Sequence, residues 1–260
     1  MAATDVQNAE KKGEVQQNEN VLVSARNYRK DFGGTPVLKN INFDLHHKEN
    51  IVFLGKSGSG KSVLIKSMVG LHRPTAGQLE VLGHDLMHIS DKELVDLRRK
   101  VGYLFQGGAL YDSMTVRENM RFPLERQLEP PSDDEMEELV KDGLESVGLG
   151  HTADKMPSEL SGGMKKRIAL ARTLVLRPKI MLYDEPTTGL DPVTSKEISQ
   201  LLLDMREKYD ITSIVVTHDI SSAEMVSDKL YILKEGEFGA EGTFDELAQS
   251  EEEWIRAFFE

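Results

Sequence analysis

The sequence lacks cysteine altogether, which excludes disulfides, zinc–thiolate sites and thiol nucleophiles. It also lacks a long hydrophobic run, because no stretch of the 260 residues approaches the roughly 20 apolar residues that span a membrane. The longest apolar runs, at 180–183 and 214–216, have the length of buried strands. The polar N-terminus offers no secretory signal. We therefore expect a globular protein of a reducing compartment, the cytoplasm.

Basic residues are in the minority, with 32 Lys and Arg against 44 Asp and Glu and a formal net charge of −12. Broad nucleic-acid binding needs a basic surface, so no nucleic-acid partner is expected. Hydrophobic residues make up 39% of the chain, which is enough for a substantial core.

The chain divides into segments of different character. Residues 1–20 are polar and predict a disordered tail, whereas 21–45 predict mostly short antiparallel strands. A buried strand at 50–54 leads into a glycine-rich loop and a helix. Helical patterns dominate 107–176, which indicates a helical insertion between two strands of an α/β core. The expected helices cover 91–100, 116–124, 134–147, 164–176, 192–208 and 220–227, and the later strands 180–184, 211–217 and 230–238.

Residues 55–62 read Gly-Lys-Ser-Gly-Ser-Gly-Lys-Ser and fit the complete GxxxxGK[ST] pattern of a phosphate-binding loop. We call this segment the phosphate loop. Its backbone N–H groups are expected to face the β- and γ-phosphates of ATP. Lys61 is expected to supply a positive charge to these phosphates, and Ser62 a hydroxyl for Mg²⁺. These groups allow even an acidic protein to bind ATP. The other predicted nucleotide contacts in this loop are Gly55, Ser57, Gly58, Ser59 and Gly60.

Two carboxylates follow the apolar strand at 180–184. Adjacent acids at a buried strand end are costly unless a cation or a reaction uses them. Asp184 is placed to hold Mg²⁺ through water, and Glu185 to polarise the attacking water, although a solvated turn is the alternative. His218 ends another strand, where it is expected to donate a hydrogen bond to the γ-phosphate. Gln106 also ends a strand, and by position alone it is an ordinary loop glutamine.

A short loop, Ser161-Gly162-Gly163, precedes the helix expected at 164–176. Ser161 is the expected N-cap, and a helix start with bare glycine N–H groups is suited to an anion. The alternative for this loop is a role in packing alone. The alternative for Lys165, Lys166 and Arg167 is that they form only a solvated face of the helix.

Phe32 precedes a Gly-Gly turn. An exposed aromatic ring there suits the face of an adenine base, and a core phenylalanine is the alternative.

Together these residues resemble the ABC ATPase family over about 21–240. The resemblance implies a P-loop (RecA-like) α/β core with an N-terminal antiparallel β subdomain and a helical ABC insertion at about 107–176. It implies that Gln106 ligates Mg²⁺ and contacts the water, and that Thr188-Gly189-Leu190-Asp191 is the D-loop. Residues 160–164, the signature loop, would bind ATP held by a second copy, so a homodimer is expected. Ser62 replaces the more frequent threonine of the family, and Met164 the usual glutamine.

A narrower resemblance, to the Mce/Mla-type lipid transport ATPases, rests on residues 105–124, 156–164 and 254–259. It implies a dimer on the cytoplasmic face of a bacterial inner membrane, beneath membrane permease subunits and with an Mce-domain periplasmic protein as a possible partner. Residues 241–260 form a C-terminal tail that packs either on its own domain or on a partner subunit. The alternatives are an amino-acid or lipoprotein ABC system, a non-transport ABC ATPase and a regulatory nucleotide-binding module.

Overall fold

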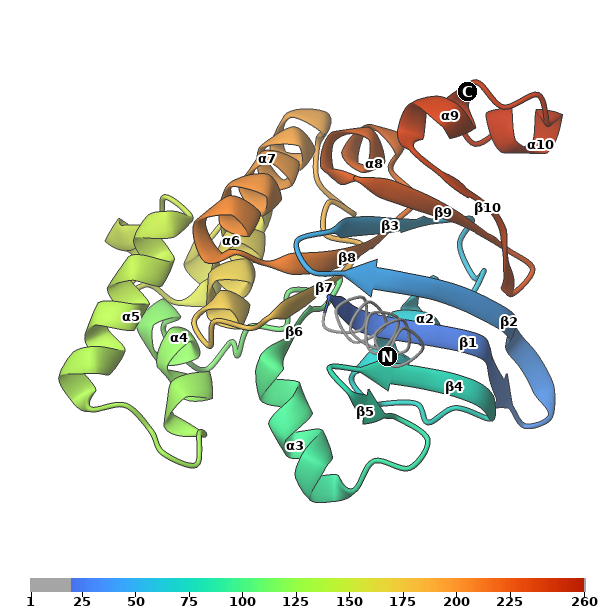
Figure 1. Cartoon of the computed structure of the whole chain (residues 1–260). Helices are drawn as coiled ribbons and strands as arrows, with labels where there is room; N and C mark the ends of the chain where they lie inside the picture. The colour runs from blue at the N-terminus through green and yellow to red at the C-terminus, as the bar shows by residue number, and fades with distance from the viewer. Residues whose placement is uncertain (1–19, 260) are drawn as a thin grey trace, which may run out of the picture.

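The computed structural model describes residues 20–259, in which ten strands form one strongly curved sheet (Figure 1). The strand order is β5-β4-β1-β2-β10-β9-β3-β8-β7-β6. The strands are β1 (Val21–Phe32), β2 (Thr35–His46), β3 (Asn50–Leu54), β4 (Ala76–Val81), β5 (His84–Asp85), β6 (Val101–Leu104), β7 (Ile180–Asp184), β8 (Thr212–Thr217), β9 (Lys229–Lys234) and β10 (Glu237–Gly242).

The N-terminal arm of the sheet is antiparallel, as expected, but its strands are not short. β1 and β2 each run for 12 residues and pair along their whole length. Their register shifts at several points, and Asn27 takes a left-handed conformation with φ of 49°. Such bulges interrupt the period-two alternation of a strand, so one long strand looks like several short ones in the sequence.

The rest of the sheet is mainly parallel, with β9, β3, β8, β7 and β6 as successive parallel neighbours. Every residue of β3, β7 and β8 is buried. Alternate residues face opposite sides, so Ile51 and Phe53 join one hydrophobic cluster and Val52 and Leu54 join the other. Both faces of β3 are therefore covered by hydrophobic clusters, which explains its continuous apolar sequence.

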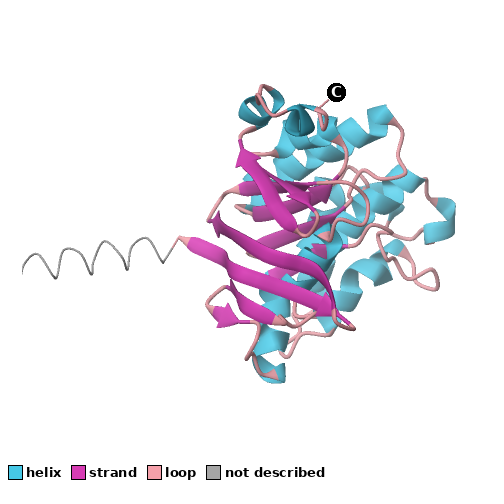
Figure 2. Cartoon of the chain, turned by 90° about the vertical axis from the view of Figure 1, so that its right-hand side faces the viewer, coloured by secondary structure: helices cyan, strands magenta, loops and turns pink. Residues whose placement is uncertain are grey.

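Nine α-helices and two 3₁₀ turns accompany the sheet within the described residues. They are α2 (Lys61–Met68), α3 (Asp91–Lys100), α4 (Val116–Glu125), α5 (Asp133–Ser146), η1 (Gly150–Thr152), η2 (Pro157–Glu159), α6 (Gly162–Leu174), α7 (Pro192–Tyr209), α8 (Ile220–Val226), α9 (Phe244–Ala248) and α10 (Glu253–Arg256). The helices expected from the sequence agree to within two residues. Capping boxes at Ser90, Thr115 and Ser132 explain why the first residues of α3, α4 and α5 are predictable from the sequence. Figure 2 shows the helices gathered mainly on one side of the sheet.

The C-terminal segment packs on its own chain. Leu247 and Ile255 are buried in the same cluster as Val52, and the Trp254 ring lies against β10. A Cβ atom on Gly239 would come within 2.8 Å of that ring, so the indole requires glycine beneath it. A contact of this segment with a partner subunit stays a prediction, and the tail expected at 1–20 lies almost wholly outside the described residues.

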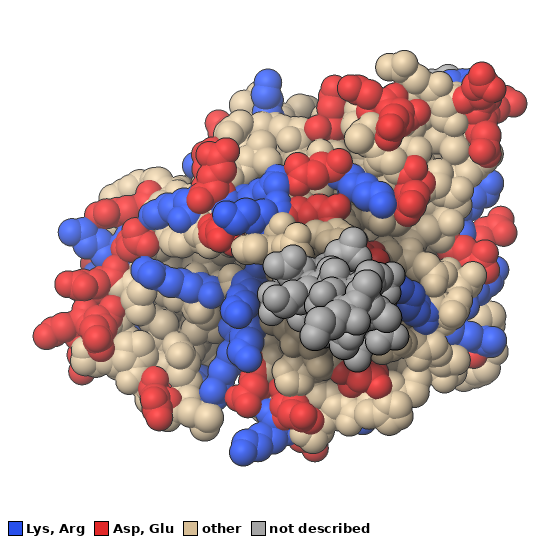
Figure 3. Space-filling model, viewed as in Figure 1, with Lys and Arg blue, Asp and Glu red and all other residues tan. Residues whose placement is uncertain are grey.

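Charge is mixed on the face shown in Figure 3, where lysine and arginine side chains lie among aspartate and glutamate. Ion pairs within the chain include Arg121–Asp133 at 2.6 Å and Lys208–Asp142 at 2.8 Å. In the part of the chain that the structure describes, no helix is long and apolar enough to cross a bilayer.

One buried amide fixes the segment that follows β6. Asn119 on α4 is fully buried, accepts a hydrogen bond from the Tyr111 backbone N–H at 2.8 Å, and donates to the carbonyls of Tyr111, Met114 and Thr115. We expect Asn119→Ala to lower the free energy of unfolding by about 2–3 kcal/mol, because it leaves buried backbone groups unpaired. Urea unfolding followed by circular dichroism measures this. Asn42→Ala, at an exposed position, is the control, and an equal effect of both changes would contradict the assignment.

Candidate nucleotide site

The phosphate loop joins the end of β3 to the start of α2, so the buried strand fixes one end and the helix the other. Gly60 has φ of 107°, a conformation that other residues rarely adopt. A Cβ atom on Gly55 would lie 2.6 Å from the carbonyl oxygen of Leu233. The Ser59 hydroxyl is buried and has no hydrogen-bond partner among the described residues. A buried hydroxyl without a partner in a glycine-rich loop fits a loop that binds an oxygen-rich anion.

The Lys61 ammonium lies inside this loop. Its Nζ donates to the Gly55 carbonyl at 2.6 Å and to the Lys56 carbonyl at 3.2 Å, and it lies 3.7 Å from Oε1 of Glu185. Burial lowers the pKa of Lys61, and the nearby carboxylate of Glu185 opposes that shift. Main-chain carbonyls and one carboxylate thus hold a desolvated positive charge where phosphates would arrive.

Asp184, at the end of β7, is held through both carboxylate oxygens. Ser62 Oγ donates to Oδ1 at 2.7 Å, and the Tyr103 hydroxyl donates to Oδ2 at 2.8 Å. Burial raises the pKa of Tyr103, and the charge of Asp184 adds to the shift, so the phenol stays a donor. A hydroxyl and a carboxylate are hard oxygen ligands, which suits Mg²⁺.

Glu185 connects two strand ends. It has φ of 52°, unusual for a residue other than glycine, and its N–H donates to the Val216 carbonyl of β8 at 2.9 Å. Its Oε2 lies 2.8 Å from Nδ1 of His218 and accepts from the Thr188 hydroxyl at 3.0 Å. Backbone strain of this kind is concentrated at functional sites.

Gln106 follows β6 with an exposed side chain, and its backbone carbonyl accepts a hydrogen bond from Lys166 Nζ. The alternative of a solvated face for Lys166 is wrong, since its side chain is buried and burial lowers its pKa. Lys166 shares a face of α6 with buried Leu170, four residues on, and that spacing was the available signal.

Phe32 lies at the end of β1 with 41% of its surface exposed, so it is not a core residue. Its ring meets His72 edge-on at 5.0 Å between centroids, and Lys30 Nζ lies 4.9 Å from the ring centre. No sequence pattern indicated that His72 and Lys30 lie beside the Phe32 ring.

Ser161 caps α6, its hydroxyl accepting from the Met164 backbone N–H at 3.2 Å. A cavity beside the signature loop is lined by Ser161, Gly162, Gly163 and residues 189–191. Within residues 20–259, no hydrogen bond or ion pair joins Ser161 to the phosphate loop. The structure therefore joins Lys61, Ser62, Asp184, Glu185 and His218 through hydrogen bonds and ion pairs in which Ser161 takes no part within the described residues.

Comparisons with known proteins agree with this geometry. The ABC transporter family pattern matches residues 38–188. The probable ribonucleotide transport ATP-binding protein mkl of Mycobacterium leprae is 40% identical over 238 residues, 92% of this chain and 68% of that protein. The intermembrane phospholipid transport system ATP-binding protein MlaF of Haemophilus influenzae is 36% identical over 231 residues, 89% of this chain and 87% of that protein. The chain thus spans about two thirds of the mycobacterial relative.

A solved structure is also similar. The dimeric ATP-binding cassette MJ0796, bound to ADP and Pi in a post-hydrolysis state, matches with a TM-score of 0.77 and 34% identity. The match covers 85% of this chain and 98% of that one.

Proposed function

This chain belongs to the ABC transporter family and is an ATP-hydrolysing subunit, and we propose that it drives transport of phospholipid or another hydrophobic cargo between the inner and outer membranes of a bacterium. The observation that carries the hydrolytic role is the contact of Glu185, after β7, with both Lys61, at the start of α2, and His218, after β8. The overlap with MlaF, which spans most of both proteins, supports the cargo. The cytoplasmic face of the inner membrane is the proposed location.

The proposed active unit is a homodimer with two ATP molecules at its interface. Lys61 and the phosphate loop of one copy bind the phosphates, and Ser161, Gly162 and Gly163 of the other copy close over them. A cavity beside Ser161, Gly162 and Gly163 leaves room for a ligand there, and the dimeric state of the MJ0796 cassette also supports this arrangement. The start of α6 supplies free N–H groups and a positive dipole end for the phosphate.

Within each site, Glu185 is the proposed general base that accepts a proton from the attacking water. His218 and Thr188, both hydrogen-bonded to Oε2, orient that carboxylate, and its Oε1 faces the Lys61 ammonium at 3.7 Å. Lys61 neutralises charge on the γ-phosphate. Ser62, Asp184 and Gln106 would hold Mg²⁺, which supplies charge neutralisation at the β- and γ-phosphate oxygens when bound.

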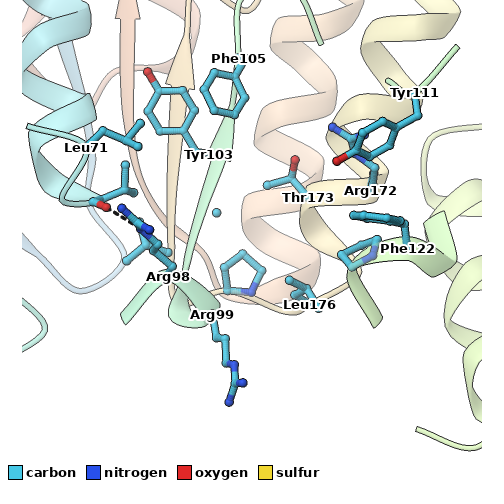
Figure 4. A pocket seen from close by; sticks show the side chains of 15 residues that line it. Leu71, Arg98, Arg99, Tyr103, Phe105, Tyr111, Phe122, Arg172, Thr173 and Leu176 are labelled. Atoms are coloured by element: carbon cyan, nitrogen blue, oxygen red, sulfur yellow. Dashed lines mark hydrogen bonds between the residues drawn. The ribbon is translucent and has the colours of Figure 1, made fainter. Parts of the chain in front are cut away.

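We propose that the membrane permease contacts a pocket beside β6, here named the β6 pocket. It is lined by Val69, Leu71, Arg98, Arg99, Val101, Gly102, Tyr103, Phe105, Tyr111, Phe122, Pro123, Arg172, Thr173, Leu176 and Pro178 (Figure 4). Leu71, Phe105 and Tyr111 are between 41% and 49% exposed and line the same pocket, and exposed apolar side chains gathered at one place mark interaction sites. The pocket adjoins Gln106, so a partner here would lie next to the nucleotide site. A periplasmic Mce-domain protein would then complete the system.

Reconstitution tests the cargo. The full chain, assembled with its membrane permease, is placed in proteoliposomes that contain fluorescent phospholipid. We expect ATP-dependent transfer of phospholipid to acceptor vesicles, and no transfer with Glu185→Gln. Uptake of an amino acid or a nucleotide instead, without phospholipid transfer, would contradict the proposal. The name of the mycobacterial relative makes ribonucleotide the first alternative cargo to assay.

Phe32 is the proposed stacking surface for adenine. Replacing it with alanine removes a base–aromatic contact that contributes about 1–3 kcal/mol, so we expect the KM for ATP to rise about tenfold or more while kcat changes little. Steady-state hydrolysis measures both constants. Phe32→Tyr should behave like the parent, and Leu128→Ala, at a position 78% exposed, is the control. An unchanged KM for Phe32→Ala would remove Phe32 from the site.

A further inference from the structure

Tyr103 lines the β6 pocket and also donates a hydrogen bond to the candidate metal-binding carboxylate. Its hydroxyl donates to Oδ2 of Asp184 at 2.8 Å, while Ser62 holds Oδ1. Asp184 is only 4% exposed, so these two hydroxyls determine how the carboxylate is oriented. No sequence pattern points to a role for Tyr103.

The sheet register explains this contact. Tyr103 of β6 pairs with Leu182 of β7, and Asp184 lies two residues beyond Leu182 on the same face of the strand. The Tyr103 side chain therefore reaches diagonally from β6 to Asp184 on β7. A phenylalanine in its place would fill the same space but could not donate to the carboxylate.

The ring of Tyr103 lies on the pocket side. It packs against Phe105 with 4.4 Å between ring centroids, and Figure 4 shows its hydroxyl pointing away from Arg98. Phe105 is itself 41% exposed in the pocket. A segment that enters the β6 pocket would therefore press on the residue that holds Asp184.

We propose that Tyr103 is a positioning residue that couples the β6 pocket to the metal-binding carboxylate of Asp184. The hydroxyl fixes the orientation of Asp184, and the stack with Phe105 fixes the hydroxyl. The inference rests on the proposed ATP–Mg²⁺ site and deepens it. Removal of an outer-shell hydrogen bond of this kind weakens metal binding about ten- to hundredfold.

Metal binding without turnover provides the test. Purified full-length chain is mixed with ATP and Mn²⁺, and free Mn²⁺ is counted by its paramagnetic resonance signal. We expect Tyr103→Phe to weaken Mn²⁺ binding about tenfold or more, with unchanged ATP binding in metal-free buffer. The Mg²⁺ concentration for half-maximal hydrolysis should rise in parallel. Thermal unfolding of the variant shows whether the fold is retained.

Tyr209→Phe is a matched control, because it also deletes a tyrosine–aspartate hydrogen bond, to Asp142 at 2.9 Å, and neither residue belongs to the candidate site. It should bind Mn²⁺ like the parent. Equal Mn²⁺ affinity of Tyr103→Phe and the parent would overturn the inference. Failure of the parent chain to bind ATP would instead overturn the proposed site itself, so the two failures are distinguishable.

A double-mutant cycle tests the coupling. Phe105→Ala removes the stacked ring without touching Asp184, and we expect it to weaken Mn²⁺ binding by less than Tyr103→Phe does. In a chain that already lacks the Tyr103 hydroxyl, loss of the Phe105 ring should not change the Mn²⁺ affinity further. The double variant should therefore bind Mn²⁺ as Tyr103→Phe does. Additive effects of the two changes would show that Phe105 does not act through Tyr103.

Discussion

Glu185→Gln is expected to bind ATP yet hydrolyse it about 10²- to 10⁴-fold more slowly than the parent, the range that a general base contributes. Glutamine keeps the size of the side chain and an oxygen that accepts from Thr188, but it does not take a proton from water at neutral pH. The ATP-bound state should therefore persist. Phosphate release measures the rate, and light scattering after gel filtration with ATP should show a dimer that the parent does not accumulate.

Glu207→Gln, at an exposed position of α7, is the control for the same chemical change. It should hydrolyse ATP normally and show no trapped dimer. Normal hydrolysis by Glu185→Gln would instead show that another group accepts the proton, and the strained backbone of Glu185 would then need a different explanation.

Mixing two inactive variants should restore hydrolysis. Lys61→Ala removes the phosphate-binding charge, and Ser161→Asp keeps a helix-capping group but places a negative charge where phosphate is expected. In a mixed dimer, one site combines the intact phosphate loop of one chain with the intact signature loop of the other. Equal mixing makes half of the dimers mixed, so recovery should reach about one quarter of parental activity for independent sites.

The mixture needs controls for each chain alone, and both should be inactive at every protein concentration. Ser161→Thr retains a hydroxyl cap and should stay active. Activity of Ser161→Asp alone would contradict a phosphate contact. A mixture that stays inactive, although gel filtration shows mixed dimers, would contradict a site shared between chains.

The phosphate loop and the acidic strand end were predictable because local sequence encodes them. A strand, a glycine-rich turn and a helix start follow one another within 12 residues, and each has its own composition. The helix boundaries were predictable for the same reason, since a capping residue such as Thr115 lies beside the turn that it stabilises.

The contacts that support these residues were not predictable in this way. Tyr103 meets Asp184 across 81 positions of the chain, and Lys166 meets the Gln106 carbonyl across 60. Such partners are set by strand register and helix packing, to which no short pattern corresponds. Lys166 carries a charge that usually indicates solvent exposure, and only its spacing from Leu170 pointed to burial. The long strands β1 and β2 were missed because bulges interrupt their alternation.

The position of β3 between two hydrophobic clusters has a consequence for local unfolding. Segments open one after another in a folded protein, and those with the most buried contacts open last, often only when the whole molecule unfolds. The phosphate loop begins at a strand of this kind, with every residue buried on both faces. The loop is therefore anchored at its start to a late-opening part of the chain, so ATP meets a strand end that is already ordered before binding.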